Sequence, residues 1–274
     1  MITASNPSAT MEPTAQSPIP DDAPVSLSPQ HLRAVRRSRR IIDYPGFVVP
    51  YAVGTPEAWV AYQFSLLDQP DVQVESILWC LDEGNVAYHP SKVLPRHLDE
   101  SMQPWYDAGV DAYQLMVEET HKRGLEAIFT YRINGYDRSV DDVPFAQPVK
   151  EAHPEWLIPD GWIPTGMWNF AEPGVHEYKT AILREIVAQY DFDGICLDFA
   201  RHPPNLPVGR QWEYRHGMTR FIAGVRQMLQ QVAQTRGKPL LFSVRVAATV
   251  PGCHYDGLDI ATWVRGNLID LIMP

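Results

Sequence analysis

The sequence contains little that would suit an extracellular or membrane protein. It has three cysteines, Cys80, Cys196 and Cys253, without metal-type spacing, and Cys80 and Cys196 lie in apolar runs, where a free thiol behaves as a small buried hydrophobe. No apolar run approaches the roughly 20 residues of a membrane span. The N terminus lacks the charged segment and apolar stretch of a signal peptide. These absences predict a soluble, cytoplasmic protein that binds no membrane.

Concentrated positive charge is also missing. The net charge of −10 at pH 7 argues against a nucleic-acid partner, because phosphate binding needs clustered lysines and arginines. One short basic run is the exception, and we expect it to be a solvated lead-in to the first strand. It consists of Arg33, Arg36, Arg37, Arg39 and Arg40.

Several signatures of cofactor and nucleophile chemistry do not occur. No glycine-rich phosphate loop follows the first apolar run, and there is no Gly-x-Ser-x-Gly nucleophile elbow. The nine histidines form neither a His-x-His pair nor a zinc-site pattern, and no lysine falls at a strand end where a Schiff base would be expected. We therefore expect no cofactor and no metal, and the oligomeric state stays open.

The chain divides into a tail and one large domain. Residues 1–38 are rich in Pro and Ser with few large apolar side chains, which predicts a disordered tail. From residue 39, helical periodicity alternates with six apolar runs, at 41–49, 76–81, 127–133, 194–199, 240–247 and 268–273. Nearly continuous apolar strands belong in a parallel sheet covered on both faces. Residues 39–274 are therefore predicted to form an α/β fold, a (β/α)8 TIM-type barrel that is incomplete, with about six βα units. A doubly wound open sheet is the alternative.

Charged side chains fall where such strands end. Along residues 194–199, Cys196 and Asp198 share one face, which we expect to point toward the barrel axis. Arg132 ends the preceding strand on the inward face, and Arg245 does so in the following strand. Two arginines beside Asp198 should keep it ionised, as suits a nucleophile or a stabiliser of an oxocarbenium-like transition state. A structural ion-pair cluster filling the barrel mouth is the other interpretation.

The segment Tyr190-Asp-Phe-Asp-Gly-Ile-Cys-Leu-Asp-Phe-Ala-Arg-His-Pro resembles the fourth-strand signature of a bacterial glycosyl-hydrolase-like barrel family. The resemblance spans about residues 39 to 274 and includes Tyr131-Arg-Ile-Asn, His153-Pro-Glu-Trp, Ser243-Val-Arg-Val and Leu268-Ile-Asp-Leu-Ile-Met-Pro. It implies a carbohydrate-directed hydrolase. The pattern departs from better-known families. Ala200 stands where chitinases have the glutamate that acts as general acid, and Cys196 stands where alpha-amylases have an arginine.

Glycoside hydrolysis needs a second carboxyl group. Asp82 and Glu83, after the second strand, are the candidates placed beside Asp198, with Asp137, Asp256 or an acid beyond Pro274 as alternatives. Candidate substrate-binding residues are Arg132, Asn134, Arg245, His202, Trp79 and Asn169, although His202 and Asn169 could instead form a helix cap or loop contact. The long segment 134–169, with its tryptophans, is expected to bind ligand.

These observations predict a hydrolase of O-glycosidic bonds in an oligo- or polysaccharide. The sugar, the linkage and the choice between retention and inversion stay open. The competing interpretation is a carbohydrate-binding or scaffold barrel that kept its strand-end charges but lacks the general acid.

Overall fold

The computed structural model describes residues 24–44, 55–82, 86–95, 103–135 and 148–274. Its strands are β1 (Ile41–Tyr44), β2 (Ser76–Asp82), β3 (Glu126–Arg132), β4 (Gly194–Asp198), β5 (Leu241–Arg245) and β6 (Leu271–Met273). Its α-helices are α1 (Pro29–Arg36), α2 (Pro56–Phe64), α3 (Gln103–Asp107), α4 (Ala112–Lys122), α5 (Pro148–Ala152), α6 (Pro173–Gln189), α7 (Arg215–Arg236), α8 (Val250–Tyr255) and α9 (Ile260–Arg265), with a short 3₁₀ turn, η3, at Pro154–Trp156.

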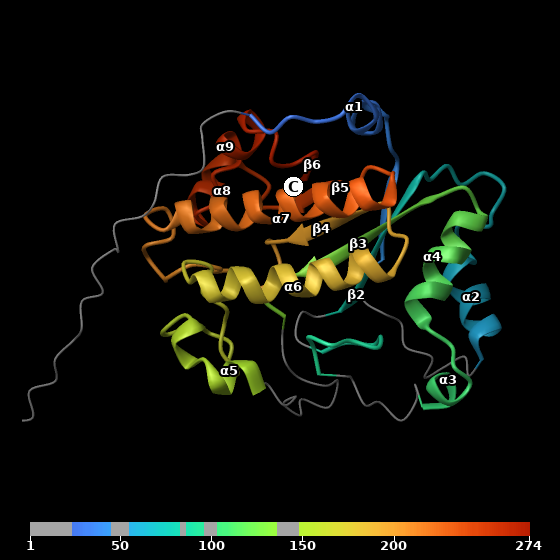
Figure 1. Ribbon diagram of the computed structural model, residues 1–274, viewed down its shortest axis with the longest axis horizontal. Helices are drawn as coiled ribbons and strands as arrows, with labels where there is room; N and C mark the ends of the chain where they lie inside the picture. The colour runs from blue at the N-terminus through green and yellow to red at the C-terminus, as the bar shows by residue number, and fades with distance from the viewer. Residues whose placement is uncertain (1–23, 45–54, 83–85, 96–102, 136–147) are drawn as a thin grey trace, which may run out of the picture.

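The six strands form one parallel sheet in the order β1-β2-β3-β4-β5-β6. The sheet is rolled, because Arg245 of β5 pairs with Asp43 of β1 although these strands are not neighbours. Strands β2 to β5 are each followed by helices before the next strand, and α2 stands between β1 and β2 (Figure 1). The predicted incomplete barrel of about six βα units is therefore confirmed.

The outer face of the sheet packs against the helices. Phe129, Ile195 and Phe242 are fully buried in the same core as Ile182 of α6 and Phe221 of α7. Figure 1 shows α6 and α7 side by side across the sheet. It shows α2 and α4 together on the side of the sheet where β2 lies. Apolar side chains repeat along one side of α6 and of α7, so burying these helix faces holds the layers together.

The inner face holds a second, smaller apolar cluster. Leu78, Ile128, Cys196 and Leu241 come from four adjacent strands, and Ala34 and Val35 of α1 pack against them together with Met273. Helix α1 therefore covers the inside of the sheet near the amino ends of its strands. Gly194 lets β4 and β5 approach here, since a Cβ at this position would lie 2.4 Å from the carbonyl oxygen of Leu241.

The prediction of a disordered tail is wrong for residues 24–38, which are ordered. Residues 1–23 lie outside the described part of the chain. Ser28 caps α1 by accepting a hydrogen bond from the His31 backbone N–H at 3.1 Å. Val25 N–H donates to the Gly266 carbonyl at 2.8 Å. Disorder was predicted because the segment has few large apolar side chains. Polar contacts and small residues order it against the barrel instead.

Arginines of the basic run also differ from expectation. The Arg39 side chain is almost completely buried and donates to both carboxylate oxygens of Glu126, at 2.6 and 3.0 Å. Arg40 pairs with Glu75. These contacts tie the start of β1 to the amino ends of β2 and β3, so this part of the run is not merely solvated.

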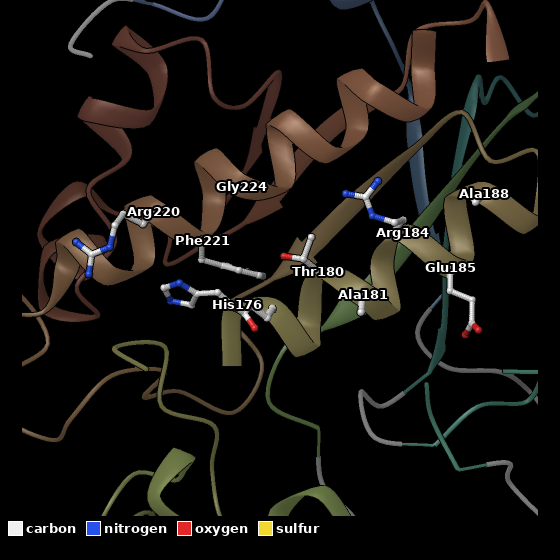
Figure 2. A pocket seen from close by; sticks show the side chains of 10 residues that line it. His176, Thr180, Ala181, Arg184, Glu185, Ala188, Arg220, Phe221 and Gly224 are labelled. Carbon is white, nitrogen blue, oxygen red and sulfur yellow. The ribbon is translucent and has the colours of Figure 1, made fainter. Parts of the chain in front are cut away.

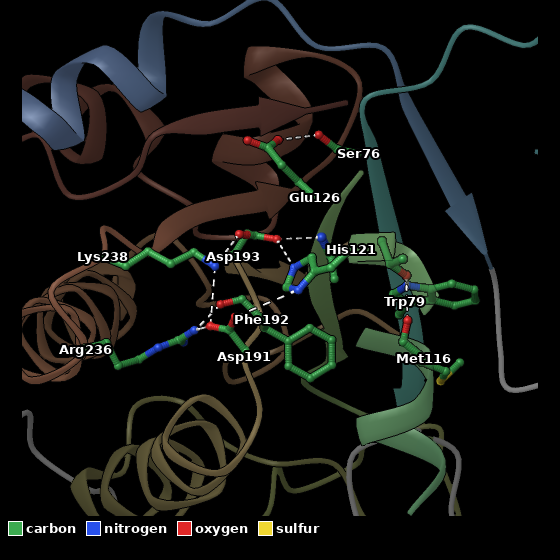
Figure 3. Close-up of polar contacts among 12 residues, drawn as sticks. Ser76, Trp79, Met116, His121, Glu126, Asp191, Phe192, Asp193, Arg236 and Lys238 are labelled. Atoms are coloured by element: carbon green, nitrogen blue, oxygen red, sulfur yellow. Dashed lines mark hydrogen bonds and ion pairs between the residues drawn. The ribbon is translucent and has the colours of Figure 1, made fainter. Parts of the chain in front are cut away.

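A polar network continues along the amino ends of the strands (Figure 3). Asp193 accepts hydrogen bonds from Ala127 N–H at 2.8 Å and His121 Nε2 at 2.9 Å, and it pairs with Lys238 at 2.7 Å. Burial alone would raise the pKa of Asp193, but these partners hold it below its ordinary value. Carboxylates at this end of a barrel contribute to stability rather than to the site.

Asp270, just before β6, is the most enclosed of these carboxylates. Its side chain is 1% exposed and contacts His31 Nε2 at 3.0 Å and Arg226 Nη2 at 2.9 Å. It also accepts from the Phe242 N–H at 2.7 Å. One carboxylate thus joins α1, α7 and β5.

Asp270→Asn should lower the free energy of unfolding by about 3 kcal/mol, because it leaves the buried Arg226 without a counter-charge. Burial raises the pKa of Asp270, but His31 and Arg226 outweigh it and hold the pKa below the ordinary value. This contribution to stability is present above about pH 4 and is lost as the pH falls through the folded pKa. Urea unfolding between pH 3 and 7 checks both, with the exposed Asp71→Asn as control; equal stability of Asp270→Asn and wild type would contradict the role.

The reactivity of the Cys196 thiol tests whether the inner face of the sheet is closed to solvent. Complete burial raises the pKa of its thiol to about 12, so the thiolate that reacts with disulfide reagents is scarce at pH 8. We expect native protein to react with Ellman's reagent at least about 1,000-fold more slowly at this cysteine than unfolded protein. Mass spectrometry after partial labelling identifies the site, and rapid native labelling of Cys196 would show that the interior is open.

Candidate functional site

The candidate site lies at the carboxyl ends of β3, β4 and β5. Pairing in the sheet sets Arg132 beside Asp198 and Asp198 beside Arg245, as the alternation of the strands predicts. Cys196 belongs to the inner cluster and Ile195 to the outer core. Asp198 therefore points to the inside of the barrel, where catalytic groups of this fold are found.

Asp198 is held firmly. It is 3% exposed, and its Oδ1 accepts hydrogen bonds from the backbone N–H groups of Ala200 at 3.0 Å and Arg201 at 3.1 Å. Its Oδ2 lies 3.5 Å from Nη1 of Arg245. In all three contacts an oxygen of Asp198 faces an N–H group, which fixes the orientation of the carboxylate.

The other end of the Arg245 guanidinium binds Asp43 of β1 through Nη2. Burial would lower the pKa of Arg245, but its hydrogen bond to Asp43 and the charges of Asp43 and Asp198 raise the pKa above the ordinary value. Oδ1 of Asp43 is buried and has no hydrogen-bond partner among the described residues. Two carboxylates thus share one guanidinium in the barrel mouth.

The sequence analysis missed Asp43. Alternation with Ile42, which packs against the outer core, could have placed it on the inner face. No local pattern, however, indicates that β1 and β5 face each other across the interior.

Arg132 is buried at the level of Asp198. Asn134 is also buried, but its amide is engaged by the loops: Oδ1 accepts from Trp168 N–H at 2.7 Å, and Nδ2 donates to Asn205 Oδ1 at 2.8 Å. Its carbonyl oxygen lies 2.8 Å from Nδ1 of His202. Asn134 therefore joins the chain after β3 to the chain after β4 and shapes the rim beside Asp198.

Trp79 requires a correction. It lies on the outer face of β2, where its ring packs edge-on against Phe64 and its Nε1–H donates to Thr120 Oγ1 at 3.1 Å (Figure 3). Alternation along β2 turns Leu78 inward and Trp79 toward the helices. Trp79 is a core residue and does not reach the barrel mouth.

Asn169 is buried, and its Oδ1 accepts a hydrogen bond from Ala171 N–H at 3.0 Å. This is the loop contact that the sequence analysis kept as the alternative to sugar binding. The turn precedes α6, so the side chain helps to begin that helix.

The structure places the candidates for the second carboxyl group less completely than it places Asp198. Asp82 ends β2, where the register shifts between Cys80 and Asp82, and Glu83 lies outside the described residues, as does Asp137. Asp256 follows α8, and burial raises the pKa of its carboxyl group. A raised pKa suits a proton donor.

The described residues contain no group of three or more His, Cys, Asp or Glu side chains placed to hold a metal ion. Within the same residues, no helix is long and apolar enough to cross a membrane.

A separate hollow of about 650 Å³ lies between α6 and α7 (Figure 2). Its lining combines charged and small side chains, including His176, Arg184, Arg220 and Gly224. These helices cover the outer face of the sheet, whereas Asp198 belongs to the inner face. The hollow is thus separate from the strand-end site.

The chain is similar to two known proteins named as glycosyl hydrolases. The chain is 29% identical over 205 residues to glycosyl hydrolase YngK of Bacillus subtilis, covering 61% of this chain and 39% of that protein. It is 26% identical over 253 residues to glycosyl hydrolase DigH of Escherichia coli K12, covering 77% and 57%. The chain therefore spans about two fifths to three fifths of the length of these relatives.

Among solved structures, a cycloisomaltooligosaccharide glucanotransferase of Paenibacillus sp. matches with a TM-score of 0.51 at 14% identity, covering 85% of this chain and 33% of that one. At this identity the match shows the shared fold alone. The resemblance inferred from the sequence is confirmed by a family match over residues 58–216. The chain belongs to the family Glycosyl hydrolase-like 10.

Proposed function

We propose that this protein hydrolyses O-glycosidic bonds of an oligo- or polysaccharide, with Asp198 as the leading catalytic carboxylate. The observation that carries the proposal is the bridge from Asp43 through Arg245 to Asp198. It holds Asp198, through Arg245, at the carboxyl end of a barrel, where the catalytic groups of this fold lie. The names of the two curated relatives agree with this chemistry.

Asp198 suits the role of nucleophile or electrostatic stabiliser. Two backbone N–H groups and Arg245 fix its orientation before substrate arrives. A pre-oriented negative charge stabilises an oxocarbenium-like transition state without reorganisation during the reaction. Arg132 and Arg245 would maintain that charge and orient the sugar.

Asp43 fits a positioning role rather than that of the proton donor, because its carboxylate is bound to the Arg245 guanidinium. Asp82 and Glu83 remain our proposed proton donors, from the chain after β2. Asp256 is the alternative, since burial raises the pKa of its carboxyl group. His202 and the loop held by Asn134 would form the wall of the sugar site.

A carbohydrate-binding protein without hydrolytic activity is the second candidate. It is favoured by the fact that both oxygens of Asp198 already have partners. A nucleophile must release one of them as the sugar enters.

A cytoplasmic location, expected from the sequence, stays part of the proposal.

Asp198→Asn should reduce kcat at least about 1,000-fold, because it removes the charge that stabilises the transition state while keeping the shape of the side chain. Hydrolysis is measured by reducing-sugar release from a mixed panel of plant and bacterial polysaccharides, using the full-length protein. The exposed Asp71→Asn is the matched control. Sugar release by wild type with undiminished release by Asp198→Asn would remove Asp198 from the mechanism, and no release by a well-folded wild type would favour the binding protein.

Asp43→Asn should lower kcat/KM about 10- to 100-fold, because Arg245 would lose one of the two charges that position it against Asp198. Both partners are partly exposed, so the loss of stability should stay near about 1 kcal/mol. Steady-state kinetics and urea unfolding of the same preparation separate these effects. Activity within twofold of wild type would show that Asp43 serves structure alone.

A further inference from the structure

Trp162 differs from the other tryptophans of the chain. Five of the eight tryptophans are almost completely buried. Trp156 and Trp212 are partly buried, and each stacks on a histidine, His153 at 3.9 Å between ring centroids and His254 at 3.6 Å. Trp162 is 55% exposed. Trp162 therefore differs both from the buried tryptophans and from the two that stack on a histidine.

The ring of Trp162 has no stacked neighbour among the described residues. His202 lies 5.6 Å from it with an angle of 59° between the ring planes, so histidine meets the indole at a tilt. The two stacked pairs have angles of 7° and 23°. A large apolar face is thus left toward solvent at Trp162.

This exposed ring is nevertheless fixed in position. Its Nε1–H donates to the carbonyl oxygen of Pro203 at 2.7 Å, so its one polar atom is already satisfied. The surrounding segment has its own small core, Ile158, Ile163 and Met167, and is closed by pairing of Leu157 with Trp168. Little ordering entropy remains to be lost when a ligand lies on the ring.

Trp162 stands on the rim of the candidate site. Pro203 and His202 follow Asp198 by five and four residues, and His202 contacts the carbonyl of Asn134 after β3. Loops after parallel strands gather at the catalytic end of a barrel. The ring therefore rests on the loop that follows Asp198 at the end of β4.

We infer that Trp162, supported by His202, is a stacking platform for a sugar ring next to the one bound at Asp198. A pyranose presents an apolar C–H face that packs on the electron-rich face of an indole. The occupant is a neutral sugar unit of an oligosaccharide or polysaccharide. This inference rests on the proposed function for the position of the reacting sugar, and it adds that substrates of two or more units bind better than a single sugar.

The test measures binding separately from hydrolysis. Proteins carrying Asp198→Asn are applied to an array of immobilised linear oligosaccharides of glucose, galactose, mannose, xylose and N-acetylglucosamine, about two to six units long. Adding Trp162→Ala should weaken binding about tenfold, whereas Trp162→Phe should keep most of it. Tyr62→Ala, which removes an equally exposed ring (55%) from α2, is the matched control and should change nothing.

Binding within twofold of the parent after Trp162→Ala, or no binding of any array member, would overturn the platform. Hydrolysis by the wild type is recorded in parallel. Loss of binding in Trp162→Ala without wild-type hydrolysis would support the platform and reject the proposed hydrolase. Hydrolysis that is unchanged by Trp162→Ala on long and short substrates would keep the hydrolase and reject the platform.

Discussion

The parallel pairing of β3, β4 and β5 is the constraint on which the rest of this structure depends. It sets Arg132, Asp198 and Arg245 at one level, and alternation sends their side chains inward while Phe129, Ile195 and Phe242 enter the helix-covered core. Shifting one strand by one residue would exchange charged and apolar faces. The same register thus stabilises the fold and assembles the candidate site.

The two ends of the sheet use charge differently. At the amino ends, Asp193 and Asp270 are surrounded by cationic partners and backbone N–H groups, which lower the pKa of each carboxyl group although burial alone would raise it. At the carboxyl ends, Asp43 keeps a buried oxygen without a partner among the described residues. A buried acceptor without a hydrogen-bond partner calls for an explanation. The positions of these carboxylates agree with the usual division between the stabilising and catalytic faces of a barrel.

The loops after β3 and β4 act as one unit. Asn134, chosen from the sequence as a sugar ligand, instead bonds to Trp168 and Asn205 and so joins these loops. Trp162 rests on Pro203 across the same junction. The rim is therefore built by side chains that bind protein, and it presents a ring that is free to stack on a ligand.

The sequence by itself indicated the strands and the face of β4 that carries Asp198, because apolar runs and period-two alternation are local properties. It also contained the family resemblance that the match over residues 58–216 confirms. Only the tertiary structure decided that α1 is ordered, that Trp79 belongs to the core and that Asp43 reaches Arg245. These features depend on contacts between segments far apart in the chain: the Asp43–Arg245 pair spans 202 positions. The curvature of the sheet creates that proximity, and no local pattern of residues encodes it.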